Sequence, residues 1–278
     1  MQIFKRIFDF YIFSNIHVAL AAFCLAKLTL LTYAIDQNLI PFFVFFSTIT
    51  GYNFIRLYKI DNIQDWFFII IKANRKVIVA LTIVSGIFVT YLGFLLNTKA
   101  LVALIPFGLF TLFYAIPIPM KKEKKVTLRS LAYFKMFLIA ISWAGVTVLI
   151  PLINYDIVFD KDVAFVFLQR FLFAVVVVIP FDIRDMNFDN EQLKTLPQFI
   201  GVQKSKILGL FTLMLFLGLE FLKNPVEPQQ LRVHFFIALV TLFFLFKANV
   251  IQHKYYSAFF VESIPMVWLG VFVFLNSS

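Results

Sequence analysis

Long apolar runs separated by short polar connections fill the chain. Nine of these runs approach the length of about 20 residues that a helix needs to cross a lipid bilayer. Their approximate limits are 10–35, 39–58, 76–96, 100–118, 130–152, 163–181, 205–222, 232–250 and 257–275. The pattern predicts an all-α polytopic membrane protein with about nine transmembrane helices. No long linker or low-complexity segment interrupts the pattern, so we expect one domain over residues 1–278.

The composition agrees with a lipid environment. Hydrophobic residues make up 62% of the chain, against roughly 45–50% in soluble domains. The net charge is +10, but the basic residues lie between the apolar runs, which argues against binding of nucleic acid. The single cysteine, Cys24, excludes an internal disulfide and a metal site built on several cysteines. The first run is long and lacks a cleavage site of small residues, so we expect no signal peptide.

The basic residues between the runs are distributed unevenly. Connections that would share a side with the N-terminus carry 19 Lys and Arg residues, and the opposite connections carry four. Cytoplasmic loops of membrane proteins are enriched in Lys and Arg. The asymmetry therefore predicts a cytoplasmic N-terminus, as in a bacterial inner-membrane protein. It also predicts that the connections after runs two, four and six lie on that same side.

The most informative polar stretch follows run six and contains Asp182, Asp185 and Asp189. Their spacing of i, i+3, i+7 places the three carboxylates on one face of a helix. Like charges this close repel one another and need a compensating cation. Mg²⁺ prefers carboxylate oxygen and commonly bridges to substrate phosphates. We interpret the stretch as a Mg²⁺ site; an acidic, solvated turn beside the membrane is the alternative.

Two further polar groups lie on the same predicted side. Asn53 and Arg56 share a helix face at the end of run two, where ionisable groups near membrane depth are often functional. A snorkelling Arg56 is the alternative there. After run four, Lys121 and Lys122 could bind an anionic phosphate, and a role in topology alone is the alternative.

Two short helices are expected beside these groups. Residues 61–76 mix charge with aromatic side chains, which is typical of a helix that lies on the membrane surface. Further along, Thr195 suits a helix N-cap, Pro197 a first turn and Gly201 a helix stop. These signals predict a short cap helix over the acidic stretch.

Together these segments resemble the UbiA superfamily of intramembrane prenyltransferases, which has nine transmembrane helices and two Asp-rich motifs. Residues 182–189, DIRDMNFD, resemble the second motif, and residues 194–201, KTLPQFIG, resemble the family's continuation after it. Residues 114–121 resemble the segment after helix four, and residues 141–144 resemble part of helix five. The resemblance covers most of the chain and implies a UbiA-type bundle.

The first motif departs from the family pattern NDxxDxxxD. The chain keeps Asn53 and Asp61, but Phe54 and Leu57 replace the two central aspartates. In the family, both motifs hold Mg²⁺ against the diphosphate of an isoprenoid donor. The resemblance therefore implies that one of the two metal sites is impaired or absent.

The function that the resemblance implies is Mg²⁺-dependent transfer of an isoprenoid chain from an allylic diphosphate to a lipid-soluble acceptor, such as an aromatic ring. Ionisation of the donor leaves a negative diphosphate, which a metal ion and basic side chains stabilise. The carboxylates implied for catalysis and metal binding are Asp182, Asp185 and Asp189. The side chains implied for diphosphate binding are Asn53, Arg56, Lys59 and Lys121, and the weaker candidates are Asp61, Tyr114, Lys122 and Lys194.

The alternative function is a catalytically inactive protein of the same fold that binds or transports an isoprenoid lipid. Arg56 and Lys59 would either replace the missing ion with fixed positive charge or mark a homologue that has lost catalysis. A transporter is expected to show inverted repeats and broken helices, and the sequence shows no convincing repeat.

Four polar residues inside the apolar runs are expected to serve the fold. Asn15 and His17 are expected to hydrogen-bond between helices. Arg170 and Glu262 are costly if unpaired, so we expect them to be paired or to snorkel, and we assign them no role in chemistry.

Overall fold

The structure is a computed structural model that describes residues 2–58, 65–116, 118–119, 125–126, 134–188 and 194–276. Its first half forms six helices: α1 (Gln2–Phe13), α2 (Ile16–Thr32), α3 (Leu39–Tyr58), α4 (Asp65–Ala73), α5 (Arg75–Gly93) and α6 (Thr98–Ala115). A short antiparallel hairpin follows, formed by β1 (Ile118–Pro119) and β2 (Lys125–Val126).

The described chain after the hairpin is helical again. Its elements are α7 (Phe134–Ala144), a π-helical turn (Gly145–Leu149), α8 (Ile150–Asn154), α9 (Lys161–Asp185), α10 (Leu196–Ile200), α11 (Val202–Gly218), a 3-10 turn (Leu219–Leu222), α12 (Pro228–Lys247), a second π-helical turn (Tyr256–Val261) and α13 (Ile264–Asn276). The predicted all-α architecture is confirmed, with the two-residue strands as the only departure among the described residues.

Seven helical segments of the described chain are long and apolar enough to cross a membrane. They are Leu39–Tyr58, Arg75–Gly93, Phe134–Asn154, Lys161–Asp185, Val202–Leu222, Pro228–Lys247 and Tyr256–Asn276. The pair α1 and α2, bent by 52°, makes an eighth if it counts as one span. The remaining run forms the shorter apolar helix Thr98–Tyr114. Every predicted run thus overlaps an apolar helix, but the count of nine spans is not confirmed.

Local signals in the sequence set several of the helix boundaries. Asp160 begins α9, because its side chain accepts a hydrogen bond from the backbone N–H of Val163 at 2.9 Å. Asn97 begins α6 in the same way. Asn15 adopts a left-handed conformation, with φ of 68°, and separates α1 from α2. The resulting bend turns the end of α1 toward α3.

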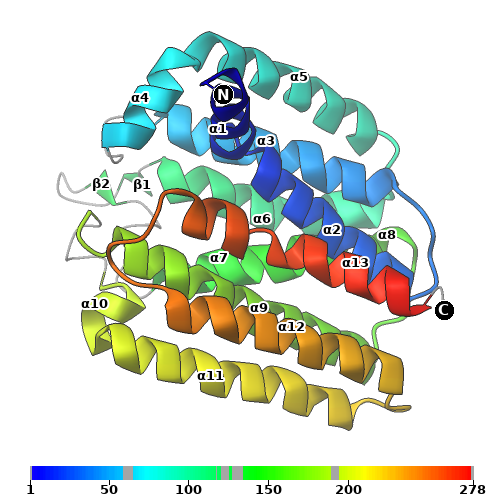
Figure 1. Cartoon of the computed structure of the whole chain (residues 1–278). Coiled ribbons are helices and arrows are strands. Elements are labelled where there is room, and N and C mark those ends of the chain that lie inside the picture. Colours follow the sequence, from blue (N-terminus) through cyan, green and yellow to red (C-terminus); the bar gives the residue numbers. More distant parts are fainter. Residues whose placement is uncertain are drawn as a thin grey trace.

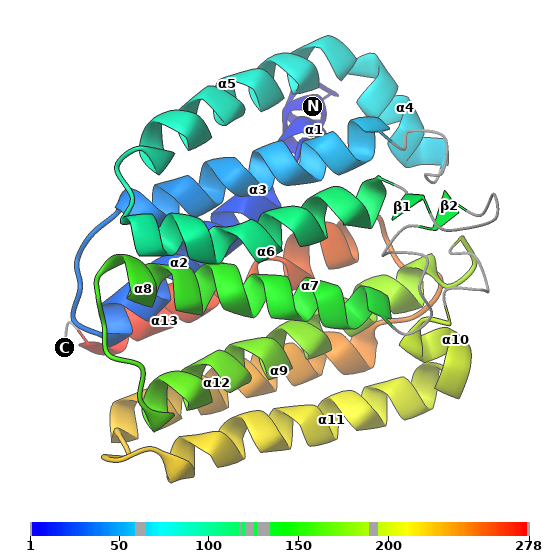
Figure 2. The ribbon, with the colours of Figure 1, turned by 180° about the vertical axis from the view of Figure 1, so that it is seen from behind.

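The long helices run side by side as a bundle, with α5 and α11 along opposite edges (Figures 1 and 2). The hairpin, α4 and α10 gather at one end of the bundle, and the chain connection between α12 and α13 passes that same end. The last turn of α9, which carries the acidic stretch, points to this end. We refer to it below as the hairpin end.

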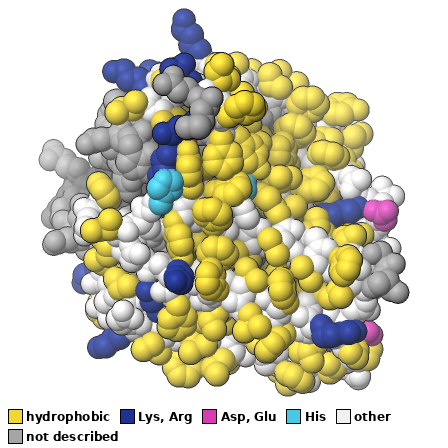
Figure 3. All heavy atoms as spheres, in the orientation of Figure 1, with side chains coloured by type: hydrophobic (Ala, Val, Ile, Leu, Met, Phe, Trp, Pro, Cys, Tyr) yellow, Lys and Arg dark blue, Asp and Glu magenta, His cyan; other side chains and the backbone are white. Residues whose placement is uncertain are grey.

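The core of the bundle is built where α2, α9, α11, α12 and α13 meet. Buried side chains from these helices include Leu25, Phe173, Phe216, Ile237 and Trp268. The rings of Phe173 and Trp268 meet edge to face at a centroid distance of 4.9 Å. The outer surface is also apolar, and hydrophobic side chains cover most of the face in Figure 3. Such an exterior suits lipid as the surrounding solvent.

Gly209 provides a test of the helix packing. A Cβ atom there would lie 2.5 Å from Leu245 Cδ2 and 3.2 Å from Ile179 Cδ1, and both neighbours are fully buried. We predict that Gly209→Val lowers the free energy of unfolding by about 1–3 kcal/mol through overpacking. Thermal unfolding in detergent measures the change. Gly218→Val on the same helix is the matched control, because no heavy atom lies within 4 Å of its Cβ position. Equal effects of the two substitutions would contradict this packing.

Candidate functional site

The carboxylate of Asp182 is buried at the acidic end of α9 and has a protein cation beside it. Only 1% of the side chain is exposed, and Lys135 Nζ lies 2.8 Å from Asp182 Oδ1. Lys135 stands in the first turn of α7, which packs along α9. The carboxylate that the sequence marks as a metal ligand therefore has an internal counterion, which lowers the cost of burying it.

The carboxylate of Asp185 is held by its neighbour in the chain. Arg184 Nε donates to Asp185 Oδ1 at 2.7 Å, and Nη2 donates to Oδ2 at 2.9 Å. This is the bidentate geometry in which guanidinium and carboxylate bind most strongly. The Arg184 guanidinium also lies over the ring of Phe181, 5.2 Å from its centroid. Asp185 is thus oriented by Arg184.

The end of α3 supplies the second part of the site. Asn53 is buried and its Oδ1 accepts a hydrogen bond from Asn15 Nδ2 at 2.6 Å. Arg56 Nη1 donates to the carbonyl oxygen of Phe13 at 3.0 Å. Phe13 is the last residue of α1, where carbonyl groups lack partners within the helix. The bend between α1 and α2 therefore positions both Asn53 and Arg56.

Side chains from several helices converge on Arg56. Its electrostatic neighbours include Tyr52, Arg184, Asp185 and Glu262. The ends of α3 and α9 therefore lie within electrostatic range of one another. Tyr52 accepts a hydrogen bond from Trp143 Nε1 at 3.2 Å, which brings α7 into the same group.

Three members of the site were not foreseen as functional residues. Lys135 and Arg184 entered the sequence interpretation only through the Lys and Arg distribution, and Glu262 was given no role. Glu262 lies within electrostatic range of Arg56 and Arg184. A carboxylate inside an apolar run was the available signal. Its partners are distant in the chain, and the sequence alone does not name them.

Polar contacts also fix α1 against the start of the last span. Asp9 Oδ1 accepts hydrogen bonds from Lys254 Nζ and from the Tyr255 hydroxyl, each at 2.6 Å. Burial, together with the hydrogen bond to Asp9, raises the pKa of Tyr255 above its ordinary value. His17 Nε2 donates a hydrogen bond to the carbonyl of Phe259 at 3.0 Å, and Nδ1 hydrogen-bonds the Tyr11 hydroxyl at 2.9 Å, so its predicted interhelical role is confirmed.

The two predicted short helices are present at the hairpin end. The region expected to form a surface helix contains α4. Thr195 caps α10 in a capping box with Gln198, and Gly201 ends the helix with φ of 83°. Of the weaker site candidates, Tyr114 is partly buried, and the exposed Lys194 has a positive φ of 45° just before α10. The remaining predicted site residues lie outside the described residues: Lys59, Asp61, Lys121, Lys122 and Asp189.

The donor set limits what metal the site could hold. Within the described part of the chain, no cluster of three or more His, Cys, Asp or Glu side chains is arranged to hold a metal ion. Asp182 and Asp185 remain as two carboxylates three residues apart, while Phe54 and Leu57 offer no oxygen. Mg²⁺ is commonly bound through one or two carboxylates, with substrate phosphates and water as its other ligands. Among the described residues, these two carboxylates fit one Mg²⁺ ion completed by a diphosphate.

Neither a protein-family model nor a curated protein sequence matches the chain. Solved structures do match it. An apo UbiA homologue from Aeropyrum pernix K1 superposes with a TM-score of 0.69 at 14% identity, covering 94% of this chain and 98% of the homologue. The chain has the UbiA fold.

Two further structures of the UbiA fold are similar over nearly their whole length. A UbiA homologue from Archaeoglobus fulgidus bound to GPP and Mg²⁺ matches with a TM-score of 0.65 at 14% identity, covering 94% of this chain and 97% of that one. A digeranylgeranylglyceryl phosphate synthase matches with a TM-score of 0.56 at 16% identity, covering 98% and 97%. The UbiA-type bundle predicted from the sequence is therefore confirmed.

The pair of Lys135 and Asp182 makes a measurable prediction. Lys135→Met removes the cation beside a buried carboxylate, so we expect it to lower the free energy of unfolding by about 3–5 kcal/mol. Adding Asp182→Asn should recover much of this loss, and the double-mutant cycle by thermal unfolding gives the coupling energy. Lys99→Met is the control, because Lys99 and its partner Asp156 are largely exposed, and it should cost about 1 kcal/mol or less. Strictly additive effects of the two substitutions would show that the pair does not couple.

Proposed function

We propose that the protein is a single-domain integral membrane prenyltransferase. It would transfer an isoprenoid chain from an allylic diphosphate to a lipid-soluble acceptor, with its N-terminus and its site on the cytoplasmic side. The observation that carries the proposal is the approach of the acidic end of α9 to Arg56 at the end of α3. The likeness of the fold to a UbiA homologue bound to GPP and Mg²⁺ supports it.

The side chains of the chain itself would bind and orient the diphosphate. Arg56, whose Nη1 donates to the carbonyl of Phe13, is proposed to contribute positive charge to the binding of an anionic ligand. Lys59 and Lys121 are proposed to add to that charge. Lys135 and Arg184 keep the carboxylates of α9 in place, and they offset the repulsion between them before a ligand arrives.

The proposed reaction begins when the allylic carbon–oxygen bond breaks and its electron pair leaves with the diphosphate. The acceptor then bonds to the prenyl carbon and loses a proton. Asp182, Asp185 and Asp189 would hold a Mg²⁺ ion, which supplies positive charge to the leaving group when bound. Aromatic faces such as those of Tyr52 and Trp143 would exclude water and attract the allylic cation.

A catalytically inactive protein that binds or transports an isoprenoid lipid is the second candidate. Phe54 and Leu57 favour it, because they remove two metal ligands of the family's first motif. The cations that already accompany Asp182 and Asp185 favour it as well, because a site with internal counterions is stable without a metal. Turnover of an isoprenoid diphosphate would distinguish the prenyltransferase from the inactive lipid-binding protein.

Binding and turnover of radiolabelled isoprenoid diphosphates by the purified protein test the proposal. We expect Mg²⁺-dependent binding that weakens tenfold or more in Asp182→Ala and Asp185→Ala, because each removes a carboxylate from the proposed metal site. Asp36→Ala is the matched control, since Asp36 pairs with Lys27 away from the hairpin end. Binding that ignores Mg²⁺ and both substitutions would remove the metal site from the proposal. Binding without turnover over a broad panel of acceptors would favour the inactive lipid-binding protein.

Restoring the first motif gives an independent test. Phe54→Asp with Leu57→Asp returns both central aspartates beside Arg56. We predict that the double variant binds the diphosphate with a several-fold stronger dependence on Mg²⁺, measured as the metal concentration that gives half-maximal binding. An unchanged metal dependence would show that Arg56 and its neighbours have rebuilt this half of the site without a metal.

A further inference from the structure

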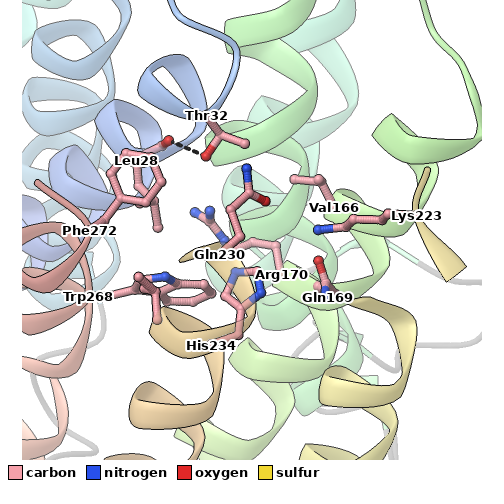
Figure 4. Close-up of a pocket in the computed structure, with 11 residues that line it drawn as sticks. Leu28, Thr32, Val166, Gln169, Arg170, Lys223, Gln230, His234, Trp268 and Phe272 are labelled. Carbon is pink, nitrogen blue, oxygen red and sulfur yellow. Dashed lines mark hydrogen bonds between the residues drawn. The ribbon is translucent and has the colours of Figure 1, made fainter. Parts of the chain in front are cut away.

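A second buried polar cluster lies in the half of the bundle remote from the acidic stretch. Arg170 and Gln169 come from α9, His234 from α12 and Trp268 from α13 (Figure 4), and Glu220 comes from the turn after α11. Gln169 and Arg170 are each 3% exposed, and Glu220 is fully buried. Twelve residues of α9 separate Arg170 from Asp182, which is ~18 Å along the helix axis. This cluster is therefore distinct from the proposed prenyl-transfer site.

Arg170 is a buried cation whose hydrogen bonds all go to neutral groups. Its Nη1 donates to the carbonyl of Leu25 at 2.9 Å and to Thr147 Oγ1 at 3.2 Å, and its Nη2 donates to Thr29 Oγ1 at 3.3 Å. The guanidinium also lies 5.1 Å from the ring centroid of Trp268. Among the described residues, no carboxylate forms an ion pair with Arg170, and its Nε has no hydrogen-bond partner. A buried charge in a bilayer normally has a counterion.

The one carboxylate of the cluster is already used by other groups. Glu220 Oε2 accepts hydrogen bonds from Gln169 Nε2 at 2.9 Å and from Lys223 Nζ at 2.8 Å, and it lies 2.8 Å from His234 Nδ1. Asp162 lies within electrostatic range of Lys223. The carboxylate of Glu220 therefore interacts with Lys223 and His234, and it forms no ion pair with Arg170.

A small cavity lies beside Arg170. Its lining includes Thr32, Gln230 and Phe272 together with Arg170 and Trp268, and Figure 4 shows Gln230 and His234 from α12 close to the Arg170 side chain. Trp268 is 2% exposed, and its Nε1–H has no hydrogen-bond partner among the described residues. The cavity is partly open, and the space available to the centre of a water-sized group is about 20 Å³, which is room for one such group. Two residues that each have an unsatisfied donor thus line a small cavity.

We propose that this cavity binds a single small anionic group, which serves as the counterion of Arg170. A halide ion or one oxygen of a carboxylate or phosphate has the required size and charge. The Nε–H of Arg170 and the Nε1–H of Trp268 would donate to it, and the amide of Gln230 would close the cavity. Such an anion comes either from solution or from the headgroup of an anionic lipid. By joining α9, α12 and α13, it would stabilise the folded bundle.

Thermal unfolding of the full-length protein tests the site with defined anions. In detergent at constant ionic strength, chloride or formate replaces gluconate, which is too large for the cavity. In a second arm, nanodiscs of phosphatidylcholine are compared with nanodiscs that also contain phosphatidylglycerol. We expect a saturable rise in the unfolding temperature in at least one arm, because the anion binds only the folded state. A rise with free anions identifies a solution ion, and a rise with phosphatidylglycerol alone identifies a lipid headgroup.

Substitutions in the cavity test whether the rise in unfolding temperature depends on Arg170. Arg170→Met should weaken the apparent anion affinity tenfold or more, and Trp268→Phe, which keeps a ring and loses the donor, several-fold. Arg232→Gln is the matched control, because Arg232 is an exposed cation on α12 that does not line the cavity. If Arg170→Met does not fold, Trp268→Phe and Gln230→Ala test the same cavity. Unfolding temperatures that are independent of anion and lipid, or a full response in the folded variants of the cavity, would overturn the proposal.

Discussion

A charged side chain within a bilayer is costly unless a partner accompanies it. This constraint determines where the polar side chains of the spans lie in the structure. The apolar surfaces of the helices face outward, so the polar residues of the spans are directed inward and meet one another. Asn15 donates a hydrogen bond to Asn53, and Lys135 forms an ion pair with Asp182. Glu220 accepts hydrogen bonds from three donors. The polar interior is therefore divided into one group at the hairpin end and a second group around Arg170 and Glu220.

The same constraint changes the meaning of the acidic motif. Carboxylates grouped at the edge of a bilayer are expected to await a metal ion, yet Asp182 and Asp185 are each accompanied by a cation of the chain. A folded site whose buried carboxylates already have cationic partners can stay assembled while no ligand is bound. A metal ion with its diphosphate would then compete with Lys135 and Arg184 for the same oxygen atoms, and the site would be emptied and filled without unfolding.

The sequence predicted those features that depend on neighbours along the chain. Apolar periodicity gave the helices, and Thr195 and Gly201 gave the ends of the cap helix, because caps act within a few residues. Contacts between distant segments were not predictable in the same way. Lys135 and Asp182 are 47 positions apart, and nothing in the local pattern around Lys135 distinguishes it from a cation that sets topology. The count of spans was also uncertain, because helix length alone does not say whether α1 and α2 act as one unit or whether α6 reaches both surfaces.

The bend at Asn15 has a consequence for the position of the charged Arg56 side chain. It exposes the carbonyl of Phe13 at the end of α1, and this carbonyl accepts a hydrogen bond from Arg56 Nη1 at 3.0 Å. A helix terminus used in this way holds a cation ready at little electrostatic cost. The kink between the first two helices thus fixes the position of this guanidinium, and straightening it would displace a positive charge at the end of α3 without altering a single ionisable group.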